Sequence, residues 1–121
     1  MPLKVAIHYH NSFNTMPGFY PTVGAVVISS THEGAGLPAL EAAAAGRLVI
    51  STPVGHWDRV GYKGAVEVPI DEVQFVDRCA GALSFYKNNP KDYEARCYGI
   101  REHAKGYDWQ YHIESWINLI E

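Results

Sequence analysis

The sequence predicts an α/β fold, in which a partial parallel sheet of about four strands is flanked by helices and followed by three consecutive helices. Two observations support this prediction. As far as residue 70, short apolar runs that suit strands alternate with turns and a helical pattern, and such alternation implies right-handed crossovers between parallel strands. From residue 71 onward, apolar residues recur at helical spacing. We therefore expect a single domain over residues 1–121.

The four expected strands fall into two kinds. The segments LKVAIHY (residues 3–9) and GAVEVP (residues 64–69) alternate between apolar and other residues, as strands do. The segments GAVVIS (residues 24–29) and RLVIST (residues 47–52) are continuous apolar runs, which are typical of strands buried on both faces of a parallel sheet. Between the first two strands, the turn-rich segment NSFNTMPGFYP leaves room for one helical turn at residues 17–20.

Four helices are expected. The segment LPALEAAAAG has Pro38 suited to its first position and Gly46 to its end. The next helix follows Asp71, which can cap it, and ends near Pro90. Its shared face comprises Val73, Val76, Cys79, Ala80 and Leu83. A helix from Pro90 places on one stripe Tyr93, Cys97, Ile100 and Ala104. A last helix, from about Asp108, should direct inward Trp109, Ile113, Trp116, Ile117 and Ile120.

The overall composition argues against several classes of protein. The net charge is -3 and the basic residues are scattered, which predicts no nucleic-acid partner and no anionic membrane surface. No segment approaches the ~20 apolar residues of a membrane span, and no signal peptide pattern is apparent. Cys79 and Cys97 occupy apolar positions of helical patterns, which predicts buried thiols in a reducing compartment. These features predict a soluble protein of the cytoplasm.

The segment STHEGAGLPALEAAAAG carries two glutamates, Glu33 and Glu41, separated by seven small or apolar residues. It begins at the carboxyl end of a predicted parallel strand, where open α/β sheets bind ligands. Gly34 and Gly36 allow a ligand to approach the backbone, and the start of the helix offers amide groups and a positive dipole that suit a phosphate. We expect Glu41 in the first helical turn, as an ionised carboxylate that accepts hydrogen bonds from a vicinal diol such as a ribose.

Glu33, on the loop, would reach a different part of the same ligand. A ligand with hydroxyl groups at both ends and phosphate between them is a nucleotide sugar. A second interpretation stays open on the pattern alone: Glu33 as a solvated loop residue, and Glu41 as a helix acid that contributes less than ~1 kcal/mol.

The segment EGAGLPALEAAAAG, followed by LVISTPVG, resembles the signature of the retaining glycosyltransferases of family 4 (group 1), which have the two-domain GT-B architecture. The hallmark of this family is a Glu, seven residues and a second Glu, with Gly-Leu-Pro before the helix; Glu33 and Glu41 fit it. The segments VAIHYHNSFNTMPGFY…GAVVISS, GAVEVPIDE and NNP…YDWQYHIESWINLIE resemble the flanking parts, so the resemblance covers about residues 5–121. It implies an incomplete, Rossmann-like donor-binding domain.

The resemblance implies a role for each matching residue. Glu33 would be catalytic: it would contact hydroxyls of the donor sugar and help to stabilise charge at the reacting centre. Glu41 would hold the nucleotide ribose, and the amides of Ala35, Gly36 and Leu37 would face the sugar and the diphosphate. The donor would be a UDP-, GDP- or ADP-linked sugar, with no metal in the site and no cofactor.

Three positions depart from the family pattern. Ala35 stands where the family often has an aromatic residue, and Leu48 stands where a Pro is usual. The segment HWDR at residues 56–59 replaces the common Gly-x-Pro-Glu, and this difference bears on the choice of donor because that loop borders the site.

The resemblance also implies parts outside this chain, namely the acceptor domain and the first two strands of the donor domain. The predicted function is therefore the donor-binding portion of a retaining glycosyltransferase that transfers a hexose, with no appreciable activity expected of the chain alone. The alternative is a non-catalytic nucleotide-sugar binding or interaction module completed by a partner chain. An NAD-binding domain is disfavoured, because no G-x-G-x-x-G follows the first strand.

The implied lack of neighbouring strands has a structural consequence. The strand at residues 24–29 would be an uncovered apolar edge, and such edges recruit other strands. The hypothesis is that residues 5–9 dock there, or that two chains form a homodimer or exchange strands across it.

Overall fold

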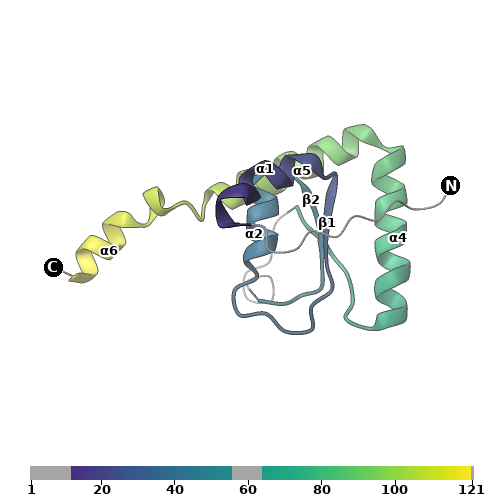
Figure 1. Cartoon of the computed structure of the whole chain (residues 1–121), viewed down its shortest axis with the longest axis horizontal. Helices are drawn as coiled ribbons and strands as arrows, with labels where there is room; N and C mark the ends of the chain where they lie inside the picture. The colour runs from purple at the N-terminus through teal and green to yellow at the C-terminus, as the bar shows by residue number, and fades with distance from the viewer. Residues whose placement is uncertain (1–11, 56–63, 121) are drawn as a thin grey trace.

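The structure is a computed structural model that describes residues 12–55 and 64–120, and it has an α/β fold (Figure 1). Three strands form a parallel sheet in the order β1-β2-β3: β1 (Ala25–Ile28), β2 (Leu48–Ser51) and β3 (Val66–Glu67). The predicted fold class is confirmed, and three of the expected strands are present. The expected strand at residues 3–9 lies outside the described residues.

The central strand is β2, and all four of its residues are buried, as its continuous apolar run predicts. Ala25 of β1 lies opposite Leu48, and Ile50 lies opposite Val66 of β3. Within the described ranges no strand pairs with the outer edge of β1. Among the described strands, the best-buried one therefore lies in the middle of the sheet, and none pairs with the outer edge of β1.

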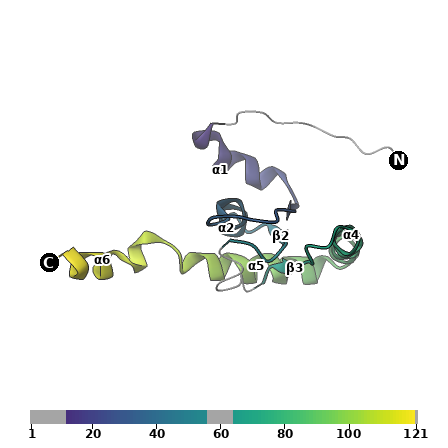
Figure 2. The ribbon, with the colours of Figure 1, turned by 90° about the horizontal axis from the view of Figure 1, so that it is seen from below.

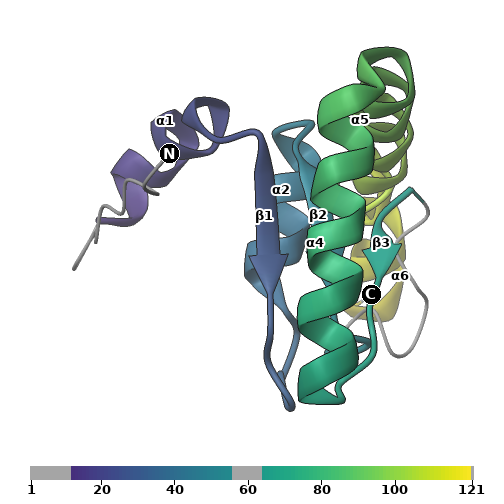
Figure 3. The same cartoon turned by 90° about the vertical axis from the view of Figure 1, so that its right-hand side faces the viewer.

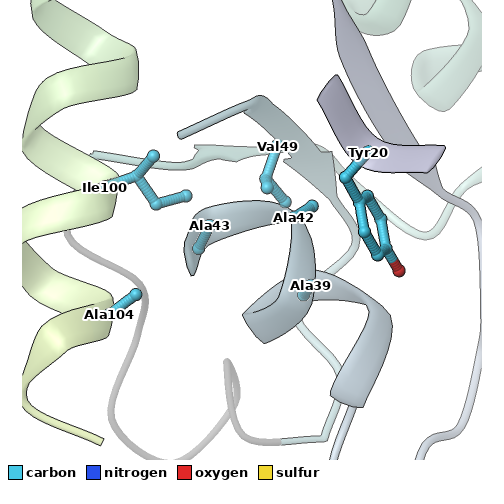
Figure 4. Close-up of a cluster of buried hydrophobic side chains, with 7 residues drawn as sticks. All are labelled: Tyr20, Ala39, Ala42, Ala43, Val49, Ile100 and Ala104. Atoms are coloured by element: carbon cyan, nitrogen blue, oxygen red, sulfur yellow. The ribbon is translucent and has the colours of Figure 1, made fainter. Parts of the chain in front are cut away.

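One face of the sheet is covered by α2 (Leu37–Ala44). Pro38 is the second residue of this helix, one position after the expected first position, and Gly46 follows its end with a φ of +67°, as predicted. Small side chains let α2 lie close to the sheet in a first buried cluster, shown in Figure 4, which comprises Tyr20, Ala39, Ala42, Ala43, Val49, Ile100 and Ala104.

The opposite face of the sheet packs against α4 (Glu72–Asn88), and Figure 3 shows α4 in front of the sheet and α2 behind it. The next helix, α5 (Pro90–Lys105), contacts α4, β2 and α2. The second buried cluster comprises Leu48, Ile50, Val68, Cys79 and Cys97. Both cysteines are buried free thiols, as predicted. The predicted stripe of α5 is also confirmed: its residues contribute to both buried clusters.

The predicted inward face of α4 is wrong in part. Asp71 caps the helix as expected, since its Oδ1 accepts a hydrogen bond from the Gln74 amide at 3.0 Å. However, Val73 and Val76 are 78% and 63% exposed. The side chains of α4 that pack against the second cluster, or belong to it, are Phe75, Cys79, Ala82 and Tyr86. The helix carries two apolar stripes, and the sheet meets the stripe with the larger, aromatic side chains.

The segment before the sheet consists of η1 (Phe13–Thr15), α1 (Met16–Phe19) and η2 (Tyr20–Thr22), where one helical turn was expected. Figure 2 shows α1 on the α2 side of the molecule, away from α4 and α5. Tyr20 is buried in the first cluster, and Met16 and Phe19 of α1 pack against it, so both α1 and η2 attach this segment to the fold.

The chain ends with η3 (Trp109–Tyr111) and α6 (Ile113–Ile120), which project away from the sheet (Figures 1 and 2). The helix is present as predicted, but its apolar residues do not point into a core: Trp116 is 52% exposed and Ile120 is 79% exposed. The inward direction expected for Ile113, Trp116, Ile117 and Ile120 is therefore wrong. None of the described helices combines the length and apolarity needed to cross a bilayer.

Candidate functional site

The loop between β1 and α2 is tied to the carboxyl ends of two strands. Thr52, which directly follows β2, is buried, and its Oγ1 donates a hydrogen bond to the carbonyl oxygen of Ser30 at 2.6 Å. The amide of Thr52 donates to the carbonyl oxygen of Ile28 at 3.2 Å. These bonds hold the start of the loop at the edge of the sheet where parallel α/β proteins bind ligands.

Glu33 is exposed on this loop. The Ser30 hydroxyl donates a hydrogen bond to Glu33 Oε1 at 2.7 Å, so the residue that orients the carboxylate is itself held by Thr52. An ionised carboxylate has about four acceptor positions. Glu33 can therefore accept further hydrogen bonds from the hydroxyl groups of a ligand.

Two glycines shape the loop around Glu33. Gly36 and Gly55 have φ values of +71° and +61°, which residues with a side chain rarely adopt. A Cβ at Gly55 would lie 3.0 Å from both Glu33 Cβ and the Gly36 amide nitrogen. The chain after β2 thus runs directly against the loop, and only a glycine leaves room for that approach.

The start of α2 has the features of an anion-binding helix end. Gly36 is the N-cap residue and has no side chain to accept hydrogen bonds from the first amides. Ala35 and Leu37, on either side of it, are exposed. A helix start of this kind presents backbone amides and the positive end of the helix dipole to an approaching ligand.

Glu41 lies in the second turn of α2, and the expected position in the first turn is wrong. Its Oε2 accepts a hydrogen bond of 2.7 Å from the Tyr20 hydroxyl. Burial, the hydrogen bond to Glu41 and the negative charge of Glu41 all raise the pKa of Tyr20 above its ordinary value of 10.0. Tyr20 therefore remains a hydrogen-bond donor at neutral pH. The helix dipole contributes less to holding Glu41 than this direct contact does, because its effect fades beyond the first turn.

Glu41 also lines a pocket of about 400 Å³ between α1 and α2. The other lining residues are Met16, Pro17, Tyr20, Pro21, Ala44 and Ala45, so the wall is apolar apart from Glu41 and the Tyr20 hydroxyl. Glu33 is not part of this lining. Since Glu41 is four residues beyond the start of α2, about 6 Å along the helix axis, a ligand that contacts both glutamates must extend from the pocket to the loop.

Other charged and titratable residues have structural or solvent-facing positions. Arg47 lies at the amino end of β2, opposite to the candidate site, and donates from Nε to the Ala45 carbonyl at 3.2 Å. His32 is exposed and contacts Thr31 Oγ1 at 3.2 Å. Among the described residues, no group of three or more His, Cys, Asp or Glu side chains is arranged to hold a metal ion. The segment HWDR at residues 56–59 lies outside them.

Four residues that shape the candidate site were not singled out from the sequence: Tyr20, Ser30, Thr52 and Gly55. Gly55 has the clearest local signal, because it ends the STPVG segment that halts β2. Tyr20 ends a segment that resembles the family, but no local pattern indicates its contact with Glu41, which is 21 residues away along the chain. Long-range side-chain contacts of this kind require the fold to be known.

The fold and these loops define a parallel α/β domain with a candidate ligand site at the carboxyl end of its sheet. A family model described as "Glycosyl transferases group 1" matches residues 2–84, which is more than half of the chain. The chain therefore belongs to the group 1 glycosyltransferases, and the resemblance noted from its sequence is confirmed. No curated protein matches the chain.

Two of the solved structures that share this fold show how much of a longer protein the chain covers. The C-terminal domain of a glycosyl transferase group 1 family protein (LpcC) from Francisella tularensis superposes with a TM-score of 0.71 at 26% identity, over 84% of this chain and 51% of that one. Sucrose-phosphate synthase from Thermosynechococcus elongatus superposes with a TM-score of 0.70 at 23% identity, over 84% of this chain and 26% of that one. This second match bears on the fold alone. The chain thus spans about half of the first structure and about a quarter of the second.

Proposed function

We propose that the chain is the donor-binding portion of a retaining glycosyltransferase, which transfers a hexose from a nucleoside-diphosphate sugar to an acceptor. The observation that carries this proposal is the position of Glu41. The second glutamate of the family motif lines the pocket between α1 and α2, and a hydroxyl donor holds its carboxylate. An acidic acceptor in an apolar pocket suits a ribose diol attached to a flat base.

In this proposal the two glutamates bind opposite ends of the donor. Glu41 accepts hydrogen bonds from the ribose hydroxyls, and the amides of Ala35, Gly36 and Leu37 bind the diphosphate and the adjacent sugar. Glu33 accepts hydrogen bonds from hydroxyls of the hexose. When the bond between the sugar and the diphosphate breaks, positive charge develops at the anomeric carbon, and the nearby negative charge of Glu33 stabilises it.

The same proposal includes a limit on what the chain does alone. Negative charge develops on the diphosphate as it leaves, and its stabilisation is usually a large part of catalysis in such reactions. No described residue that lines the pocket at Glu41 is a lysine or arginine, and Arg47 lies at the end of β2 that is distant from the loop where the diphosphate would bind. We expect the isolated chain to bind donors without appreciable turnover, and formation of a glycoside by the purified chain would contradict this expectation.

Calorimetry with pairs of ligands tests the two roles separately. UDP-, GDP- and ADP-sugars are titrated alongside UDP, GDP and ADP. Hydrogen bonds to a charged group contribute about 1.5–3 kcal/mol each, so Glu41→Gln should weaken binding of both members of a pair by roughly 10- to 100-fold. Glu33→Gln should weaken binding of the nucleotide sugar and leave binding of the free diphosphate unchanged.

The matched control for these variants is Glu94→Gln, because Glu94 is exposed in the middle of α5. It should bind every ligand as the wild type does. Equal affinities of the Glu41→Gln variant and the wild type for all six ligands would refute the proposed ribose site.

The outer edge of β1, with which none of the described strands pairs, supports a further part of the proposal, self-association. This strand consists of Ala, Val, Val and Ile, and Val27 is 43% exposed. Unpaired backbone groups beside apolar side chains favour pairing with another strand. We expect the isolated chain to form homodimers or to exchange strands across this edge. Light scattering coupled to size-exclusion chromatography measures this directly, and a monomer at all concentrations would count against it.

A further inference from the structure

We propose that Tyr20 is a positioning residue of the candidate site: its hydroxyl holds the Glu41 carboxylate in the orientation that accepts both hydroxyls of a nucleotide ribose. This inference rests on the proposed function. Tyr20 does not belong to the motif that contains the two glutamates, and it lies 21 residues before Glu41 in the chain.

The phenol ring of Tyr20 is firmly held. Only 6% of the residue is exposed, and its ring belongs to the first buried cluster with Ala39 and Ala42 of α2. Figure 4 shows the ring standing beside these alanines with its oxygen pointing away from the rest of the cluster. From this position the oxygen donates the 2.7 Å hydrogen bond to Glu41 Oε2.

The backbone around Tyr20 is held as well. Its amide donates to the Met16 carbonyl oxygen, and its own carbonyl accepts a hydrogen bond from the Val23 amide at 3.2 Å. Pro21, the next residue, has a restricted φ. Met16 and Pro21 also line the pocket at Glu41. The segment that forms the pocket wall therefore also sets the position of the hydroxyl that holds the carboxylate.

The acceptor capacity of Glu41 allows Tyr20 and a ribose to bind at the same time. A carboxylate has about four acceptor positions, of which Tyr20 occupies one, and a vicinal diol needs two. Without Tyr20, the Glu41 side chain would have to be ordered when the ligand binds. Ordering a long side chain opposes binding, and a group ordered in advance avoids that loss.

A purely structural role for Tyr20 would have a different signature. Such a role would attach α1 to α2 and would affect all ligands of the pocket alike. A positioning role affects only ligands that carry ribose hydroxyls. The ligand pair that separates the two roles is a nucleoside diphosphate and its 2′,3′-dideoxy analogue, which share the base and the diphosphate.

The experiment measures dissociation constants by calorimetry for UDP, GDP and ADP and for their 2′,3′-dideoxy analogues. Tyr20→Phe should weaken binding of the tightest of the three ribonucleotides by about 3- to 30-fold and leave binding of its dideoxy analogue unchanged. In the Glu41→Gln background, Tyr20→Phe should have a much smaller effect, because the two side chains act as one unit.

Tyr93→Phe is the matched control. The Tyr93 hydroxyl donates a hydrogen bond of similar length, 2.6 Å, to the Gly24 carbonyl oxygen, and Tyr93 does not line the pocket at Glu41. Loss of this hydroxyl should affect thermal stability to a similar extent as Tyr20→Phe, without changing the preference for ribonucleotides.

The outcomes separate this inference from the proposed function. If Glu41→Gln weakens ribonucleotide binding and Tyr20→Phe does not, the ribose site stands and the role of Tyr20 is refuted. An equal loss for both ligands of a pair, or a Tyr20→Phe chain that does not fold, makes Tyr20 structural and also refutes it. If the wild type binds the ribonucleotide and its dideoxy analogue equally, or binds neither, the proposed ribose site fails and the role of Tyr20 fails with it.

Discussion

Gly55 follows β2 with a φ of +61°, and a methyl group on its Cα would meet Glu33 and Gly36 at 3.0 Å. Two independent effects therefore act against any side chain at this position, the backbone conformation and the close approach. Both act on the loop that carries Glu33, so a substitution here changes the candidate site as well as the stability of the fold.

Gly55→Ala should lower the free energy of unfolding by about 1–3 kcal/mol and should weaken binding of a nucleotide sugar. The control is Gly34→Ala in the same loop, because a Cβ at Gly34 would meet no atom within 4 Å and its φ is not in the left-handed region. Chemical denaturation of both variants measures the effect. Equal free energies of unfolding of the two variants would show that the close approach of Gly55 to the loop does not contribute to stability.

Among the residues of the candidate site, the sequence indicated the two glutamates but not the side chains that orient them. Glu33 and Glu41 are apparent because their spacing and the glycines between them form a local pattern. Their partners, Ser30 and Tyr20, are not apparent in this way, since a serine at the end of a strand and a tyrosine before a proline fit many loops. Which hydroxyl reaches which carboxylate depends on how the segments pack.

The element that departs most clearly from its predicted packing is α4. Two stripes of apolar residues run along this helix: one carries Val73 and Val76, and the other carries Phe75 and Tyr86. Both stripes have helical spacing, so periodicity predicts the helix but not which stripe meets the sheet. The aromatic stripe packs against the second cluster, and the valines remain exposed.

A pair of charge insertions tests this orientation of α4. Ala82 packs against the second cluster, whereas Ala80 is exposed on the same helix. Ala82→Asp should lower the free energy of unfolding by about 2 kcal/mol more than Ala80→Asp, because only the first buries an unpaired carboxylate. The helix propensity of Asp is common to both variants and cancels in the comparison. Equal thermal denaturation midpoints of the two variants would contradict this orientation, and a lower midpoint for Ala80→Asp than for Ala82→Asp would indicate that the valine stripe faces the sheet.

The last helix, α6, is a second case in which the sequence predicts the helix but not what its apolar face contacts. Its sequence, IESWINLI, predicts an amphipathic helix, and the helix is present. An apolar face normally indicates a buried face, yet every residue of α6 is exposed in this structure. The sequence pattern indicates that the apolar face of α6 is suited to burial. Only the tertiary structure shows whether another part of the chain packs against that face.

For the whole molecule, the buried titratable groups predict how stability depends on pH. Burial raises the pKa of Tyr20, Tyr93 and Tyr107 above their ordinary value of 10.0, and that of Cys79 above 9.0. Each group keeps its proton in the folded chain at a pH where the unfolded chain has lost it. The folded state then binds more protons than the unfolded state, so stability falls as pH rises.

Below about pH 8 the four groups should not change the free energy of unfolding. Above pH 9 to 10 they should lower it progressively. Urea denaturation at a series of pH values measures it. Tyr20→Phe should make the alkaline decline shallower, because one contributing group is gone, whereas Tyr98→Phe, at an exposed position, serves as the control. A free energy that stays constant between pH 8 and pH 11 would contradict the prediction.

Local patterns in the sequence were sufficient for the fold class, the three described strands, the helices, the cap at Asp71 and the family. These features depend on interactions between residues that are close in the sequence. They are indicated by apolar periodicity, by capping residues, and by glycine and proline at the ends of helices and strands. The tertiary structure alone decided the exposed faces of α4 and α6, the position of Glu41 in the second turn of α2, and its contact with Tyr20. Those features depend on which surfaces meet when segments far apart in the chain pack together.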